Sequence, residues 1–302
     1  MRKIYFVVAL IATSVSVTGQ SFRFNGEVFM DSDRSYIQLG NFVLPPRPAA
    51  PVDESTQLTA MEAQISPNYL VRFGQRDKWA MVVTPKVVLR LGDKESFPIK
   101  APSYLPSIAL YQRLSGKKLQ TSPLTSWLVT PRHTAFLLYK ITHHSNGQKG
   151  DFFANNGVRI NYSTGNFSTD FVELGFQWLA LNPDTRSFQL NGRVSYERHL
   201  DALTREEAMK DIYYYNRFLL ELAFCFTPKI QLTLRPEWMS GKKDFDQRGA
   251  VTASLEYMPF KKASDLGFFM RFYRGPDYYN IRYFQDQTSY GIGIKARPVQ
   301  QH

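Results

Sequence analysis

The sequence predicts an all-β fold, a twelve-stranded antiparallel transmembrane β-barrel, and three observations predict it. From about residue 68 onward, one segment after another alternates apolar and polar side chains with a period of two, as β-strands do. The chain of 302 residues is rich in aromatic side chains, at 15%, although its mean hydropathy is slightly negative. Beyond residue 19 no apolar run reaches the roughly 18 to 20 residues that a membrane-spanning helix needs. Alternating strands of a barrel explain this combination.

The first 19 residues have the pattern of a secretory signal peptide. Arg2 and Lys3 precede an apolar run over residues 4–12, and small residues lead to Gly19, near which we expect cleavage. Cleavage removes two of the positive charges, so the net charge changes from +11 to 11 − 2 = +9. A basic exported protein suits anionic surfaces such as lipopolysaccharide or phospholipid headgroups. It seldom meets nucleic acid, so we expect no nucleic-acid partner.

The chain has a single cysteine, Cys225, so an internal disulfide is excluded. Stability after export must therefore come from packing and backbone pairing. Stability without disulfides is ordinary for a protein of the bacterial envelope. We therefore expect the protein to lie in the bacterial outer membrane.

Residues 20–67 differ in pattern from the rest of the chain. Their periodicity is weak, and they include the proline-rich stretch at 44–48. We expect a periplasmic N-terminal segment with little structure of its own, followed by a barrel over 68–302.

The strand expected near residue 79 illustrates the alternation. Its apolar parity comprises Trp79, Met81, Val83, Val87, Leu89 and Leu91, and its polar parity includes Thr84, Lys86 and Arg90. Twelve candidate strands lie near residues 68, 79, 106, 123, 134, 169, 187, 211, 229, 249, 266 and 288. Their polar parities carry charges of both signs, namely Lys86, Arg90, Lys140, Glu173, Arg193, Glu197, Arg217, Glu221, Arg235 and Glu237. Pairing of these charges across a small lumen favours a membrane barrel over a soluble sandwich.

Turn lengths agree with this arrangement. An even number of strands places both chain ends in the periplasm, and we then expect short periplasmic turns and longer outer loops. The short turns are at 131–133, 182–184 and 227–229, and the outer loops are at 146–168, 199–210, 239–248 and 274–287. The short connection near 75–78, which would lie outside, fits less well.

The most informative residues lie at the outer end of the strand near 134. Ile141 and the preceding odd-numbered residues are apolar and face lipid, so His143 and Ser145 continue the lipid-facing side. Lys140, Thr142 and His144 have the opposite parity and face the lumen. An imidazole beside a hydroxyl supplies a general base and a nucleophile.

The following strand presents a carboxylate on the same side. Its apolar parity, Val172, Leu174, Phe176, Trp178 and Ala180, leads back to Asp170 at the outer rim. A carboxylate there could fix the tautomer of the histidine. Two alternatives remain open, because barrel rims tolerate polar groups and Asp170 could simply begin a strand after a turn.

These residues lie in a motif that resembles the outer-membrane phospholipase A family. The match is His143-His144-Ser145-Asn146-Gly147. Further similar segments are Ser66–Tyr69, Ser122-Pro123 with Pro131 eight residues on, Tyr273 with Gly275, and Gln287–Ile294, so the resemblance covers about 230 residues.

The resemblance implies a twelve-stranded, calcium-dependent hydrolase of membrane phospholipids. It makes His143 the base and Ser145 the nucleophile. The third member in the family is usually an asparagine, and this chain departs from that pattern with Asp170 at the face-matched position. The loop asparagines Asn155, Asn156, Asn161 and Asn166 remain rivals for this role.

The resemblance also implies a calcium site and a homodimer. The best-matching positions for Ca²⁺ are Ser122, Asp151 and the carbonyl of Gln148. Asp151 is displaced by one residue from the family spacing, and a solvated loop aspartate is the alternative. Gln112 shares the lipid-facing parity and resembles a glutamine of the family's dimer contact, although a rim residue is equally compatible.

Two other functions remain open at this stage. A passive porin-like barrel would need a wide lumen, which the paired charges disfavour. A lipid A deacylase would also carry serine and histidine on the outer face of a barrel.

Overall fold

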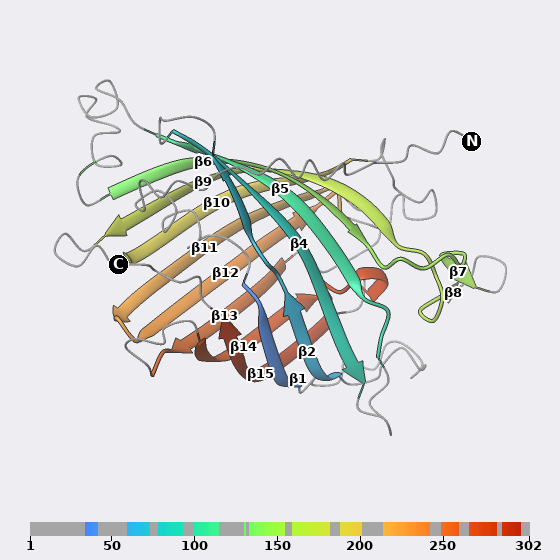
Figure 1. The fold of residues 1–302 in the computed structure, drawn as a ribbon. Helices are drawn as coiled ribbons and strands as arrows, with labels where there is room; N and C mark the ends of the chain where they lie inside the picture. The colour runs from blue at the N-terminus through green and yellow to red at the C-terminus, as the bar shows by residue number, and fades with distance from the viewer. Residues whose placement is uncertain are drawn as a thin grey trace, which may run out of the picture.

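The computed structural model describes residues 34–41, 59–72, 78–92, 99–114, 130, 133–154, 159–181, 188–200, 214–241, 249–259, 266–282 and 286–296. Its long strands form a closed antiparallel barrel (Figure 1). They are β1 (Tyr36–Asn41), β2 (Thr59–Ile65), β3 (Tyr69–Arg72), β4 (Trp79–Gly92), β5 (Ser103–Arg113), β6 (His133–Ser145), β9 (Ser168–Leu181), β10 (Phe188–Leu200), β11 (Asn216–Thr227), β12 (Ile230–Ser240), β13 (Gly249–Tyr257), β14 (Leu266–Pro276) and β15 (Asp286–Ala296).

Three short elements lie in the connections. The strands β7 (Phe153–Ala154) and β8 (Arg159–Ile160) pair with each other, and the 3-10 turn η4 (Asn280–Arg282) precedes β15. No helix in the described ranges is long and apolar enough to cross a membrane.

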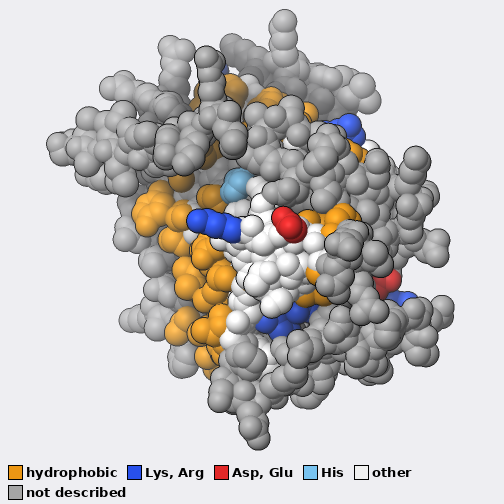
Figure 2. Space-filling model, turned by 90° about the vertical axis from the view of Figure 1, so that its right-hand side faces the viewer, with side chains coloured by type: hydrophobic (Ala, Val, Ile, Leu, Met, Phe, Trp, Pro, Cys, Tyr) orange, Lys and Arg blue, Asp and Glu red, His pale blue; other side chains and the backbone are white. Residues whose placement is uncertain are grey.

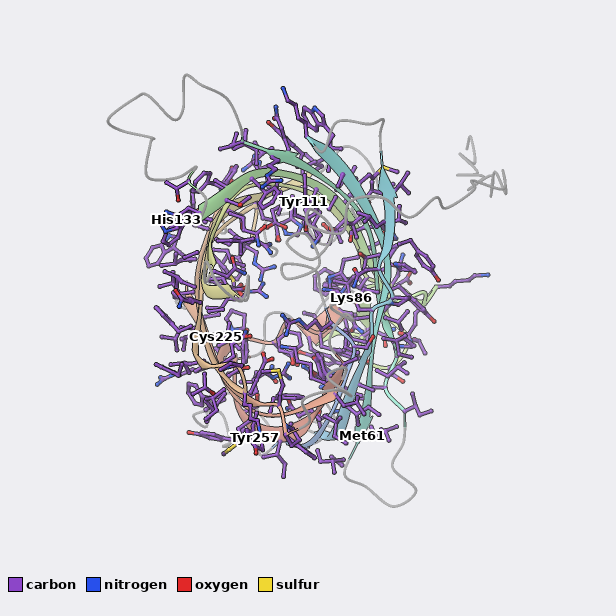
Figure 3. The ribbon with its side chains drawn as sticks, turned by 60° about the vertical axis from the view of Figure 1, so that its left-hand side comes forward. Met61, Lys86, Tyr111, His133, Cys225 and Tyr257 are labelled. Atoms are coloured by element: carbon purple, nitrogen blue, oxygen red, sulfur yellow. The ribbon has the colours of Figure 1, made fainter. Side chains whose placement is uncertain are left out.

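The barrel is closed by β1, which pairs with β15 on one side and with β2 on the other. The strands β2 and β3 follow one another along β4, where β2 pairs with residues 87–92 and β3 with 80–83. The thirteen strands of the sheet therefore form twelve rows, which confirms the predicted twelve-stranded barrel. Figure 3 looks into the ring, with Lys86 and Tyr111 pointing inward and His133 on the outside.

The N-terminal part of the chain differs from the expectation. Residues 36–41 and 59–65 are strands of the barrel, so the prediction that 20–67 has little structure of its own is wrong for these two segments. Each gains backbone hydrogen bonds on both sides, which a short, weakly alternating segment cannot form alone. The signal peptide predicted over 1–19 lies outside the described residues.

The strand expected near residue 123 falls outside the described residues. The neighbours β5 and β6 pair directly with each other. The prediction omitted the strand at 36–41 and included one near 123, so the predicted number of strands is still twelve. However, every strand between residues 59 and 113 runs in the direction opposite to the one predicted.

This reversal changes the end at which several connections lie. We call the end at which β6 finishes at Ser145 the outer end, because longer connections lie there. In the described topology the connection 93–102 lies at the outer end, and the connections 73–78 and 114–132 lie at the inner end. The short connection near 75–78 thus lies at the inner end, where short turns are the rule.

The turn between β11 and β12 shows why the inner connections can be short. The Thr227 hydroxyl accepts hydrogen bonds from the backbone N–H groups of Lys229 (3.2 Å) and Ile230 (3.1 Å). The threonine hydroxyl thus accepts from the two N–H groups that follow Pro228, which has no N–H of its own to donate.

The predicted division between lipid-facing and lumen-facing residues is confirmed. Large apolar side chains stay exposed on the outer wall, with Leu174 at 54%, Val194 at 57% and Ile292 at 59%. Exposed apolar side chains all around a closed barrel form the belt that faces lipid chains. The protein is therefore a barrel of the bacterial outer membrane.

The lumen carries the predicted charge pairs between adjacent strands. Glu173 accepts from Arg193 and lies 3.9 Å from Lys140. Arg217 bonds to Glu197 (3.0 Å) and to Glu237, which also pairs with Arg235 at 3.0 Å. These side chains line an internal cavity of about 350 Å³.

A second cluster of charges surrounds Glu62, which is completely buried. Its carboxylate accepts from the Tyr36 hydroxyl (2.6 Å), Arg90 Nε (2.7 Å), Arg271 Nη2 (2.7 Å) and the Tyr278 hydroxyl (2.7 Å). Burial raises the pKa of the Tyr278 phenol to about 12, so this hydroxyl remains a donor at neutral pH. The cluster joins β1, β2, β4, β14 and the connection after β14.

Strands β1 and β15 approach each other closely at a glycine. A Cβ atom at Gly293 would lie 2.2 Å from the backbone carbonyl oxygen of Ile37. A side chain at this position would therefore force the two strands apart.

We predict that Glu62→Gln destabilises the barrel by about 3 kcal/mol or more, because Arg90 and Arg271 would then share a buried site with a neutral amide. Unfolding in denaturant of the protein in detergent micelles measures this change. Measured without calcium, the matched variant Asp151→Asn removes an exposed carboxylate and should change stability by less than about 0.5 kcal/mol. Equal stability of the Glu62→Gln barrel and the wild type would contradict the role of this cluster.

Candidate active site

The candidate site is formed by two neighbouring strands at the outer end of the barrel. In the pairing of β6 with β9, His143 lies opposite Asp170, and Ser145 lies opposite Ser168. Directly opposite residues of antiparallel strands have their side chains on the same face. The odd-numbered residues of β6 before the site, Tyr139 and Ile141, are 40% and 44% exposed, so this face is the lipid-facing one.

His143 and Asp170 form a hydrogen bond, with Nδ1 of the imidazole 2.9 Å from Oδ1 of the carboxylate. The histidine side chain is 37% exposed and that of the aspartate 11%. Because an ionised carboxylate only accepts hydrogen bonds, Nδ1 carries the hydrogen in a neutral ring and Nε2 is left as a proton acceptor. The second carboxylate oxygen, Oδ2, is buried and has no hydrogen-bond partner among the described residues.

Ser145 continues the same face two residues beyond His143. It lies between Tyr104 of β5 and Ser168 of β9 in the register of the sheet. Gly147 follows with a φ of +68°, and a Cβ there would meet the Tyr104 ring at 3.2 Å. The chain therefore turns away from the strand directly after Ser145, close to Tyr104.

Asn146 fastens the base of the long connection that starts after Ser145. Its side chain donates to the Gly165 carbonyl (2.8 Å) and accepts from the Phe167 N–H (3.0 Å). Its own backbone N–H donates to the Phe167 carbonyl at 3.1 Å. Asn146 is in the sequence motif, but its role in closing the loop could not be read from the motif.

The lumen side of the same wall is fixed by two buried histidines. His144 Nε2 lies 3.1 Å from the Ser103 hydroxyl, and His199 Nδ1 lies 3.0 Å from the Thr169 hydroxyl. His199 Nε2 also lies 3.0 Å from Glu197. These contacts join β5, β6, β9 and β10 directly behind the residues on the outer face.

Two of the four rival asparagines can be placed. Asn161 donates to the Asp151 carbonyl (3.2 Å) and to the Thr164 hydroxyl (2.9 Å), so its amide is used within the loop. The backbone N–H of Asn166 donates to the Gly150 carbonyl. Asn155 and Asn156 lie outside the described residues. Of the residues described, Asp170 is the one that contacts the imidazole of His143.

Two of the three candidate calcium positions lie in the connection after Ser145. Asp151 is exposed, and the side-chain amide of Gln148 donates through Nε2 to the Ser163 carbonyl at 3.0 Å. A carbonyl only accepts, so the amide orientation is fixed, and Gln148 Oε1 is left buried without a partner in the described part of the chain. An unpartnered amide oxygen and a carboxylate are hard ligands that suit Ca²⁺.

The third calcium position, Ser122, remains a prediction. Ser122 lies outside the described residues, in a connection that leaves β5 at Leu114 and enters β6 at His133, both at the inner end. The 13 residues of β6 separate this end from Ser145 by roughly 40 Å. Pro98 of the outer connection 93–102 and Pro106 of β5 have the same eight-residue spacing, so the spacing alone did not distinguish the two segments.

Gln112 faces lipid as predicted, but it is the second-last residue of β5 and lies at the inner rim. Its register partner on β4 is Trp79, and the Tyr139 hydroxyl lies 3.5 Å from its amide oxygen. Water reaches a side chain at the rim, so the amide does not require a protein partner there.

The outer end of the barrel is shown in Figure 2. Apolar side chains gather along one flank and stop at a surface of polar side chains and backbone. This is the boundary at which lipid chains give way to headgroups and water.

The sequence matches no protein-family model, and no curated protein sequence is significantly similar to it. Solved structures do share its fold. Outer membrane phospholipase A from Escherichia coli superposes with a TM-score of 0.61 at 14% identity, over 88% of this chain and 97% of that one. The calcium-bound dimer of the Salmonella typhi outer membrane phospholipase gives 0.60 at 15% identity, over 88% and 90%. The NanC porin aligns at 0.45 and 11% identity over 88% and 100%. At these identities the likeness shows that this chain has the barrel fold of the outer-membrane phospholipases.

Proposed function

We propose that this protein is a serine hydrolase that cleaves acyl ester bonds of glycerophospholipids at the outer face of its barrel. The observation that carries the proposal is the His143–Asp170 hydrogen bond on the lipid-facing side of the wall, with Ser145 next along that side. Polar groups on this face are costly in hydrocarbon, so their clustering needs a reason. The shared fold with the two phospholipases agrees with it.

In the proposed mechanism, Nε2 of His143 takes the proton of the Ser145 hydroxyl. Asp170 holds the ring through Nδ1 and stabilises the imidazolium that forms. The serine oxygen attacks the ester carbonyl, the imidazolium returns its proton to the departing alcohol, and water then releases the fatty acid from the serine.

The backbone N–H of Gly147 is a candidate to hold the oxyanion. The neighbouring N–H groups of Asn146 and Gln148 already donate, to the Phe167 carbonyl and to Asn146 Oδ1 (3.2 Å). No acceptor for the Gly147 N–H exists among the residues that the structure describes. A free backbone N–H two residues after the nucleophile is the type of donor that oxyanion holes use.

We include calcium in the proposal, held by Asp151 and Gln148. When bound, it would supply a positive charge that polarises the ester carbonyl. The resemblance implied the backbone carbonyl of Gln148, and the unpartnered side-chain Oε1 of the same residue is a second oxygen available to the ion, because a buried amide oxygen without a donor is otherwise unfavourable.

A reversible homodimer is also part of the proposal. One structural neighbour is a calcium-bound dimer, and a partner barrel could cover a lipid chain lying beside Tyr139 and Ile141. Gln112 does not support this contact, because it lies at the inner rim. Sedimentation in detergent, with and without calcium, distinguishes monomer from dimer.

A porin function is less well supported. Ion pairs line the lumen, and Asp277 and Tyr279 of the connection after β14 are buried at its outer end, where Asp277 pairs with Arg90. Conductance across planar bilayers, without any release of fatty acid, would favour the porin instead.

We predict that Ser145→Ala lowers fatty-acid release from phospholipid micelles by a factor of about 1,000 or more, because the nucleophile is lost. The barrel should remain folded, as seen by its heat-sensitive migration in gels. Ser240→Ala, at the outer end of β12, removes a serine in a similar place and should leave the rate unchanged. A folded Ser145→Ala barrel with undiminished activity would exclude the proposed site.

Asp170→Asn should reduce kcat by less than about tenfold, whereas Asp170→Ala should reduce it by about a hundredfold or more. The amide oxygen can still accept from Nδ1 of His143, and the buried Oδ2 position has no partner that would oppose the amide. Initial rates at saturating lipid measure the difference. Equal rates for Asp170→Ala and wild type would show that Asp170 does not orient His143, and one of the loop asparagines would then be the candidate for this role.

Chelation should abolish the activity, and Asp151→Asn should raise the calcium concentration for half-maximal rate by about tenfold, because one charged ligand is lost. Titration of fatty-acid release with calcium gives this value. Glu256→Gln is unsuitable as a control, since Glu256 pairs with Arg34 and Lys295 in the lumen. Asp286→Asn, which changes an exposed carboxylate at the start of β15, is suitable. An unchanged calcium requirement in Asp151→Asn would exclude Asp151 as a ligand.

A further inference from the structure

The connection after β14 begins with a segment that folds into the outer end of the lumen. We call residues 277–282 the inward segment. Both oxygens of Asp277 accept from Arg90 Nη1, at 2.8 and 2.7 Å, and Oδ1 also accepts from the backbone N–H of Tyr279 at 3.0 Å. Asp277, Tyr279, Asn280 and Ile281 are all buried. The inward segment is therefore held by buried charges of the barrel.

On its far side, the inward segment contacts the outer connection that precedes β5. The Asn280 amide donates through Nδ2 to the carbonyls of Ala101 (2.9 Å) and Pro102 (3.3 Å). Two residues later, Tyr104 is the register partner of Ser145. Asn280 has a φ of 35°, a conformation that asparagine adopts more readily than other residues with a side chain. This contact fixes the chain on one side of Ser145.

The inward segment also contacts the connection on the other side of Ser145. Ile281 packs against Phe152 and Phe167 in a buried apolar cluster. A Cβ at Gly165 would lie 2.8 Å from Cδ1 of Ile281, so the approach is close. The Phe167 carbonyl in turn accepts from the N–H of Asn146, the residue after Ser145.

We propose that Asn280 and Ile281 are positioning residues for Ser145, because together they fix the two outer connections between which it lies. Neither side chain is part of the lipid-facing site. This inference rests on the proposed function, because it assumes that Ser145 is the nucleophile whose reactivity the two contacts affect.

The isosteric variant Asn280→Asp tests the inference. It keeps the Oδ1 atom that accepts from the Ile281 N–H (2.6 Å), but it replaces the donor Nδ2 with an oxygen that faces two carbonyl oxygens. Tyr278→Phe is the matched control. It lies in the same segment, but the bonds of its hydroxyl go to Glu62 and Arg271, away from both connections.

Two measurements on the full-length barrel in detergent micelles are needed. The first is the rate at which a fluorophosphonate probe labels Ser145, which reports the reactivity of the serine without lipid binding. The second is amide hydrogen exchange over residues 99–104 and 146–154, which reports whether the connections are held. We expect Asn280→Asp to slow labelling by about tenfold to a hundredfold and to speed exchange in both segments. Tyr278→Phe removes one donor to Glu62 and should lower the global stability. Its labelling should nevertheless stay within about twofold of the wild type, and its exchange in the two segments should speed no more than elsewhere in the barrel.

If the Asn280→Asp barrel does not fold, a second pair of variants tests the same inference. Ile281→Ala should slow labelling, and Ile281→Val, which keeps most of the contact with Phe152 and Phe167, should restore it. Labelling and exchange at wild-type values in a folded Asn280→Asp barrel would overturn the inference, as would faster exchange with unchanged labelling. A wild-type barrel that resists the probe contradicts the proposed function itself, and exchange alone then decides whether the inward segment fixes the two connections.

Discussion

The burial of the Glu62 carboxylate is the interaction on which closure of this barrel depends. A buried charge without partners would cost several kcal/mol, so the carboxylate is tolerable only while its donors surround it. Those donors, Tyr36, Arg90 and Arg271, come from β1, β4 and β14, which meet only when the ring is closed. The short strand β1 has few backbone bonds of its own to offer. Its place between β15 and β2 is therefore secured by side chains in the lumen as well as by the ladder.

The same cluster extends from the lumen to the candidate site. Arg90 bridges Glu62 and Asp277, and Asp277 begins the inward segment that contacts the connections on both sides of Ser145. Within β6, the period-two alternation places neighbouring residues on opposite faces of the barrel wall. His144 faces the lumen with Ser103, and its neighbours His143 and Ser145 face the lipid. Pairing in the lumen can thus stiffen the wall without occupying the face on which a lipid would lie.

Local pattern was enough to predict the wall and the face of the site. Parity alone placed His143, Ser145 and Asp170 on one side, and the register then brought His143 and Asp170 within hydrogen-bond distance. The ends of the earlier strands could not be predicted, because β1 alternates over only six residues. Missing it and expecting a strand near 123 preserved the count but reversed the strands between them. The connection that contains Ser122 was therefore expected at the outer end, whereas the strand ends that flank it lie at the inner end. The contacts of Glu62 with Tyr278 and of Asn280 with Pro102 join residues 216 and 178 positions apart, a separation that no periodicity encodes.

The height of the site on the wall is itself a physical constraint. A cationic side chain facing lipid costs about 2–4 kcal/mol at the middle of the membrane and about 0–1 kcal/mol near its surface. An imidazole that becomes charged during each proposed reaction cycle is therefore far cheaper at the rim, where β6 ends, than beside Tyr139. The ester bonds of a phospholipid lie at the same level, between the headgroup and the acyl chains, and water for the second half of the reaction is within reach there. Tyr139 and Ile141, lower on the same face, are then free to contact the acyl chain. The position of the polar groups along β6 thus suits an ester substrate of the membrane better than one dissolved in the lumen.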